Sequence, residues 1–150
     1  MNLEISKNRF NGYKDALQKY GLKFDTNMVK QCDNRESAEE ITPETLRTIK
    51  PDGFFTTNDD TALGVLYTVK RLGYKVPDDI SICGFSDGVR AVSCEPQLTT
   101  IEQRGRKVGE EAAIALIEQL EGNIPDGKYK NQIIKTKLVI RGTTRSLNNE

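Results

Sequence analysis

The chain has 150 residues, with 22 lysines and arginines against 22 aspartates and glutamates, and it contains no histidine or tryptophan. This length fits one domain, and a formal net charge of zero argues against a module that grips nucleic-acid phosphates by itself. The lack of histidine removes the commonest metal ligand and general base. No apolar run approaches the roughly 20 residues of a membrane span. The composition therefore favours a cytoplasmic binding or regulatory domain, and it argues against a hydrolase, a membrane protein or a lone DNA-binding module.

The cysteines indicate neither a metal site nor a disulfide framework. They are three in number and lack the C-x-x-C spacing of zinc ligands. Cys32 and Cys83 each lie in a strand-like run, where we expect small buried hydrophobic residues. We expect no cofactor and no metal.

Helical and strand-like patterns alternate along the first part of the chain. Apolar residues recur on one helical face over residues 7–20. A short strand is predicted over 28–32. The helical pattern over 36–49 contains Pro43, which predicts a kink or two short helices. Residues 53–57 form a compact β-prone run after a turn.

The alternation continues to the end of the chain. The predicted elements are a helix from Asp59 or Asp60 to Leu72, strands over 80–85 and 98–101, a helix over 108–120 and a final strand over 133–141, continuous or broken. Strands that alternate with helices of roughly 10–15 residues indicate βαβ units. The pattern therefore predicts an α/β fold with a mostly parallel sheet.

Polar residues follow two of the predicted strands, and ligands of parallel sheets bind beyond the carboxyl ends of the strands. Asn58 and Asp59 can offer an amide and a carboxylate to a polyol, or they can cap the following helix. Ser86 and Asp87 can bind a ligand or form a tight turn with an Asp cap. Arg9, early in the first helix, can reach hydroxyls or a carboxylate across this edge, or form a surface ion pair.

Five segments in one order resemble LacI/GalR-family transcriptional regulators. They are R-F-N-G-Y from Arg9, P-D-G-F-F-T-T-N-D-D-T-A-L-G from Pro51, V-P-D-D-I-S-I-C-G-F-S-D from Val76, P-Q-L-T-T-I-E-Q from Pro96 and L-V-I-R-G-T-T-R from Leu138. The resemblance runs from about residue 6 to residue 145. It implies the carboxyl-terminal part of an effector-binding domain, which is a partial lobe of a type I periplasmic-binding-protein-like fold with three α/β/α layers.

The resemblance also implies a small effector, usually a sugar and sometimes a purine, that binds between two lobes and changes operator affinity. The residues expected to bind it are Arg9, Asn58, Asp59, Ser86, Asp87 and Asp33; none is expected to be catalytic or to bind a metal. Ser86 stands where the family commonly has an aspartate. Many relatives have an aromatic residue after the position of Asp33, where this chain has Asn34.

The resemblance places the DNA-binding helices, the first lobe and the opening strand of the second lobe before the start of this chain. The whole range 1–150 is then one partial effector-binding and dimerisation domain, and operator DNA is bound only through the missing region. The helix at about 104–121 would pack on the missing lobe. Its apolar stripe therefore predicts a homodimer, through self-association or a swapped arrangement.

Two other functions have sequence features that argue against them. A periplasmic-type sugar-binding protein of the same fold needs a signal sequence, and residues 1–7 show no apolar stretch. An enzyme would need a catalytic pair such as Asp59/Asp60 or Asp78/Asp79. Adjacent side chains point in different directions, and the chain has no nucleophile motif, so we expect no enzyme.

Overall fold

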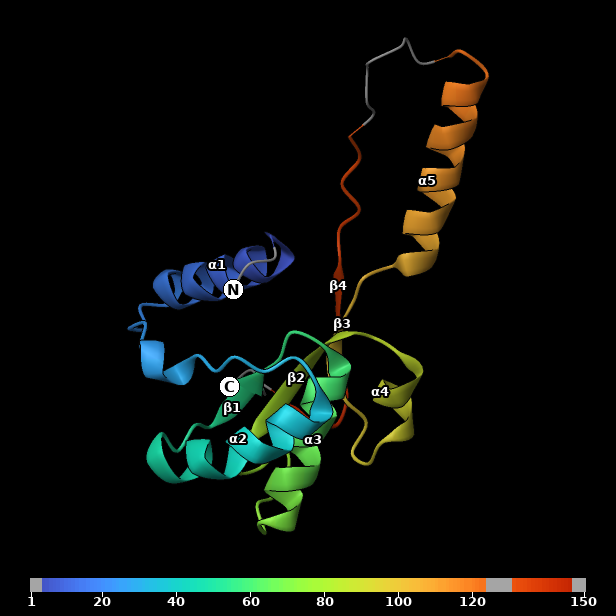
Figure 1. Ribbon diagram of the computed structural model, residues 1–150. Helices are drawn as coiled ribbons and strands as arrows, with labels where there is room; N and C mark the ends of the chain where they lie inside the picture. Colours follow the sequence, from blue (N-terminus) through green and yellow to red (C-terminus); the bar gives the residue numbers. More distant parts are fainter. Residues whose placement is uncertain (1–3, 124–130, 147–150) are drawn as a thin grey trace.

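The computed structural model describes residues 4–123 and 131–146, arranged around a four-stranded sheet with the order β1-β2-β3-β4. The elements are α1 (Glu4–Lys19), the short 3-10 helix η1 (Thr26–Met28), α2 (Arg35–Thr48), β1 (Gly53–Phe55), α3 (Asp59–Arg71), β2 (Ser81–Ser86), α4 (Val89–Ser93), β3 (Thr99–Glu102), α5 (Gly105–Leu120) and β4 (Lys137–Val139) (Figure 1). The first three strands run parallel, and β4 runs antiparallel to β3. The predicted α/β class with a mostly parallel sheet is confirmed.

The core lies between β2 and the helix pair α2–α3. Helix α3 presents Ala62, Leu66 and Val69 to the interior, and each of these side chains is fully buried. Gly64 allows α2 to approach, because a Cβ at this position would lie 2.5 Å from the carbonyl oxygen of Arg35. Helix α1 lies on the far side of β1 and β2 from α2 and α3 (Figure 1).

Pro43 predicted a kink or two short helices, and the structure rules out the second alternative, because Pro43 does not divide the helix. Helix α2 continues through it from Arg35 to Thr48. Buried residues on both sides of the proline, among them Ala38 and Leu46, hold the helix against α3. This packing outweighs the one backbone hydrogen bond that a proline removes.

The expected strand over 28–32 is not formed. The chain makes η1 and then runs without regular structure to the N-cap of α2. A strand needs a hydrogen-bonded neighbour, and no described strand pairs with this segment. Cys32 and Cys83 are half-buried, not fully buried as expected. The final strand is shorter than 133–141 and covers only Lys137–Val139.

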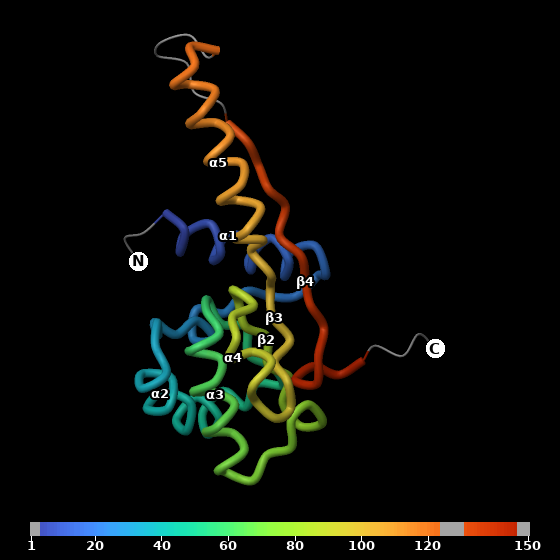
Figure 2. Tube along the Cα trace, turned by 90° about the vertical axis from the view of Figure 1, so that its right-hand side faces the viewer, coloured from blue at the N-terminus to red at the C-terminus, as the bar shows by residue number. Residues whose placement is uncertain are grey.

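Helix α5 projects from the carboxyl edge of the sheet, and the segment 131–136 returns beside it to β4 (Figures 1 and 2). No residue of α5 is buried. Within residues 4–123 and 131–146, no helix is both long and apolar enough to cross a bilayer.

Candidate functional site

Arg9 joins α1 to the carboxyl ends of β1 and β2. Its Nη1 donates a hydrogen bond of 2.7 Å to the carbonyl oxygen of Thr57, just after β1. Its guanidinium carbon lies 4.0 Å from the ring centroid of Phe85, near the end of β2. Partial burial lowers the pKa of the Arg9 guanidinium. The side chain thus reaches the edge of the sheet at which a ligand is expected.

Asn58 is the N-cap of α3, and both ends of its amide are engaged. Oδ1 accepts a hydrogen bond of 2.7 Å from the backbone N–H of Thr61. Nδ2 donates to the carbonyl oxygen of Asp33 at 2.8 Å. The capping role is therefore present, and the same side chain ties down the loop before α2. The Asp33 side chain itself is exposed.

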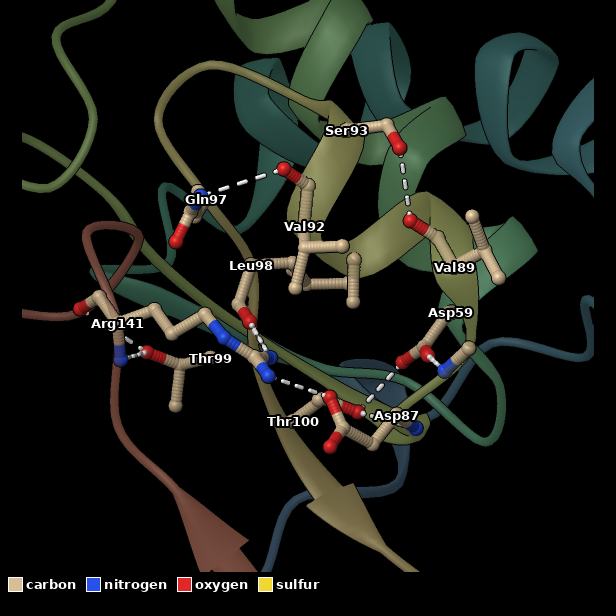
Figure 3. Close-up of polar contacts among 12 residues, drawn as sticks. Asp59, Asp87, Val89, Val92, Ser93, Gln97, Leu98, Thr99, Thr100 and Arg141 are labelled. Carbon is tan, nitrogen blue, oxygen red and sulfur yellow. Dashed lines mark hydrogen bonds and ion pairs between the residues drawn. The ribbon is translucent and has the colours of Figure 1, made fainter.

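Asp59 points into the protein and is only 6% exposed. Oδ1 accepts from the Thr100 hydroxyl at 2.5 Å, and Oδ2 accepts from the backbone N–H of Gly88 at 2.9 Å. Figure 3 shows this carboxylate between β3 and the turn after β2. Its contacts join three elements, and they use both oxygens.

Ser86, the last residue of β2, and Asp87, which follows it, have positive φ angles of 133° and 56°. The exposed Ser86 hydroxyl accepts a hydrogen bond from Gln103 Nε2 at 3.0 Å. Asp87 Oδ1 lies 2.7 Å from Arg141 Nη2, in an ion pair whose side chains are 19% and 15% exposed (Figure 3). Ser86 is thus exposed to solvent, while Asp87 holds Arg141 in the segment after β4 through this ion pair.

A shallow surface cavity of about 410 Å³, widely open to solvent, lies beside Arg9 at this edge. Its lining residues are Ile5, Asn8, Arg9, Phe85, Gln103, Ile134 and Thr136. Of the six predicted ligand-binding residues, Arg9 alone lines it, and Ser86 is joined to it through Gln103. The structure holds Asn58, Asp59 and Asp87 in contacts within the protein, so it brings the six together only in part.

Sequence reasoning missed Phe85, Gln103 and Arg141. Gln103 follows the end of β3, so the same rule of strand ends that selected Asn58 and Ser86 would have found it. The partnership of Arg141 with Asp87 joins residues far apart in the chain and has no local signal. The lining offers a guanidinium, amides and an aromatic ring, which suit binding of a polar ligand. Within the described ranges, no group of three or more cysteine, aspartate and glutamate side chains is placed to hold a metal ion.

The chain matches the family described as periplasmic binding protein-like domain over residues 2–144. It is 34% identical over 142 residues to the HTH-type transcriptional repressor CytR of Escherichia coli K12, covering 93% of this chain and 41% of CytR. A LacI-type transcription regulator from Bifidobacterium animalis subsp. lactis is 27% identical with a TM-score of 0.86, covering 97% of this chain and 52% of that one. The transcriptional regulator CelR in complex with cellobiose is 27% identical with a TM-score of 0.82, covering 90% of this chain and 41% of CelR. The chain thus spans about two fifths of the length of the curated relatives it matches.

Proposed function

Because this chain belongs to the periplasmic binding protein-like domain family, we propose that it is the effector-sensing part of a LacI-family transcription regulator. The predicted family resemblance is confirmed, since the similar proteins are HTH-type and LacI-type transcription regulators and not enzymes. The observation that carries the proposal is Arg9, which is held against Phe85 and Thr57 beside the cavity at the carboxyl edge.

The effector we propose is a sugar or another small polyol. Arg9 has guanidinium donors and Gln103 and Asn8 have amides that line one cavity. The exposed Ser86 hydroxyl is hydrogen-bonded to Gln103. Groups of this kind exchange hydrogen bonds with vicinal hydroxyls. The complex of CelR with cellobiose supports this choice.

The six predicted residues have different roles in this proposal. Arg9 and Ser86 contact the ligand, together with the exposed side chain of Asp33. Asn58, Asp59 and Asp87 shape the same edge through contacts within the protein. Their own contact with ligand would require these hydrogen bonds to rearrange.

We further propose that the range 1–150 acts as one unit in the cytoplasm, as a homodimer, and that α5 packs on a first lobe. Operator DNA would be bound by a different region of the regulator. A signal would then arise from different effector affinities of two conformations. A periplasmic-type binding protein is less favoured, because the curated relatives are transcription regulators.

The test is the substitution Arg9→Ala in the complete chain, with Lys19→Ala at the exposed end of α1 as the matched control. Cellobiose, lactose and adenosine are screened by thermal shift, and the best ligand is titrated by calorimetry. Losing a charged hydrogen-bond donor costs about 1.5–3 kcal/mol, so the Kd should rise by roughly 10-fold or more. An unchanged Kd in Arg9→Ala would remove this residue from the binding site. If neither cellobiose nor lactose binds the unmodified chain at millimolar concentration, or if adenosine alone binds, the sugar proposal is wrong.

A further inference from the structure

The cavity beside Arg9 carries a single kind of charge, and that charge is positive. Its lining combines apolar side chains with uncharged amides and a hydroxyl. Among the lining residues in the described part of the chain, Arg9 is the one that is ionised at neutral pH. A neutral sugar leaves this charge without a counter-ion, whereas an anionic sugar supplies one. The lining therefore favours a ligand that has a negative charge of its own.

The guanidinium of Arg9 is held in place by groups that carry no charge. It donates to the carbonyl oxygen of Thr57 and stacks on the ring of Phe85. Within residues 4–123 and 131–146, no carboxylate forms an ion pair with it. A guanidinium has five N–H donors, so the bond to Thr57 leaves several for a ligand. Burial without a counter-ion disfavours the charged form, in agreement with the lowered pKa of Arg9.

The carboxylates near this edge of the sheet do not neutralise Arg9. Most of them are bound to other partners: Asp59 to Thr100 and Gly88, Asp60 to Arg90, and Asp87 to Arg141. Asp33 is exposed, Glu102 is half-buried, and neither lines the cavity. The positive charge of Arg9 is therefore available to a ligand.

The uncharged polar groups of the cavity suit the hydroxyls of the same ligand. Gln103 Nε2 donates to the Ser86 hydroxyl at 3.0 Å, and Gln103 Oε1 can accept from a ligand hydroxyl. The Ser86 hydroxyl accepts through its oxygen, so its own proton can be donated to a ligand. Asn8 adds a second amide to the lining. Because none of these three groups is charged, recognition of an anionic group depends on Arg9.

We propose that the effector is a sugar acid, whose carboxylate pairs with Arg9 and whose hydroxyls bind Gln103 and Asn8. This inference rests on the proposed function, because it takes the same cavity as the effector site. A carboxylate matches the planar fork of a guanidinium with two parallel hydrogen bonds. Its single negative charge also balances the single guanidinium of the lining. A phosphate would bring a charge of about −1.5 to −2 to the same place.

The probes are glucuronate and glucuronamide, which have the same ring and differ only in a carboxylate against a neutral amide. Lactose tests the sugar site without a charge, and glucose 6-phosphate tests a phosphate in place of the carboxylate. Each is titrated into the complete chain by calorimetry at about 0.01 M and about 0.15 M salt, because salt screens charge pairs. Two variants at one position complete the design. Ser86→Asp adds a carboxylate beside Gln103, and Ser86→Asn is its uncharged match.

Glucuronate should bind about 10-fold more tightly than glucuronamide at low salt, and the ratio should fall at the higher salt concentration. Ser86→Asp should remove most of this preference, whereas Ser86→Asn should keep the ratio.

Equal affinity for glucuronate and glucuronamide would overturn the sugar-acid proposal and leave the sugar site in place. Binding of lactose without binding of glucuronate would have the same meaning. Tighter binding of glucose 6-phosphate than of glucuronate would overturn the choice of a carboxylate and identify a phosphorylated sugar instead. If no sugar binds, neutral or anionic, the sugar-acid proposal and the proposed function are both wrong.

Discussion

Asp59 holds together three segments that the chain brings in from distant positions. Its two oxygens accept from the Thr100 hydroxyl and from the Gly88 backbone. Hydrogen bonds to a charged group contribute about 1.5–3 kcal/mol each. Asp59→Ala would also leave the Thr100 hydroxyl and the Gly88 N–H without this acceptor. The side chain therefore matters for stability independently of any ligand.

We expect Asp59→Ala to lower the free energy of unfolding by about 3 kcal/mol or more. Asp59→Asn should cost less, because the amide keeps the volume and one acceptor oxygen. Urea unfolding followed by circular dichroism measures both. Asp78→Ala, at an exposed aspartate, is the control and should change the value by less than about 0.5 kcal/mol. A cost for Asp59→Ala as small as that of the control would contradict the described network.

The thiol of Cys83 makes the free energy of unfolding depend on pH in the alkaline range. Burial raises its pKa to about 11, and the nearby Asp59 carboxylate adds to the effect. The unfolded chain ionises its thiols at about pH 8.5, so the folded state keeps the proton to higher pH. This contribution to stability is complete below about pH 8.5 and declines as the pH rises toward 11. Urea unfolding at pH 8 and pH 10.5 should show the decline, and Cys83→Ala should make it smaller. An identical decline in that variant would assign it to other groups.

The position of the candidate site in the fold could be predicted from the sequence. The direction in which each side chain points could not. Asn58 and Asp59 are adjacent polar residues at the start of one helix, so they look equivalent in the sequence. In the structure, Asn58 caps α3 at the surface while Asp59 turns inward to Thr100. The difference depends on β3, about 40 residues farther along the chain. Local patterns carry no information about such a partner.

At the scale of elements, the close contact of α2 with α3 depends on one glycine. A Cβ at Gly64 would lie 2.5 Å from the Arg35 carbonyl oxygen and 2.8 Å from the Ala38 Cβ. Both neighbours are on α2, and the first is backbone. Gly64→Ala must therefore push the two helices apart, although alanine favours a helix more than glycine does.

We expect Gly64→Ala to destabilise the chain by about 1–3 kcal/mol, the usual cost of overpacking. Gly109→Ala is the matched control, since a Cβ there meets nothing within 4 Å. In that exposed position of α5, alanine should be neutral or stabilise by up to about 1 kcal/mol. Thermal and urea unfolding of both variants give the comparison. If the two substitutions have the same sign, the interhelical contact is not as close as described.

Elements with a strong local pattern were predictable, and those that depend on a neighbour were not. The apolar stripe of α3 has its interior side chains at helical spacing, and the helix forms where the pattern predicts it. Residues 28–32 have equally β-prone side chains, but a strand forms only with a partner. Pro43 shows the opposite effect, because the packing of α2 on α3 keeps a helix that the local pattern would divide.

At the scale of the whole molecule, the described structure has a packed half and an unpacked half. The buried apolar residues lie on α2 to β3, whereas α1 and α5 contain none. Val108, Leu116 and Leu120 on α5 are between 48% and 78% exposed, and Ile133 beside it is 92% exposed. The helix is about 24 Å long. An exposed apolar face of this length marks an interaction surface.

We therefore expect the chain to self-associate through α5. Sedimentation velocity should show dimers at high protein concentration, and the double substitution Leu116→Glu with Leu120→Glu should give monomers. These two residues are one turn apart on one face, so two charges in each copy oppose apolar contact at the same place. Val89→Glu is the matched control, because Val89 is 81% exposed on α4, away from this helix. A monomer at the highest concentration would contradict self-association, and a dimer that survives the double substitution would place the contact on another surface.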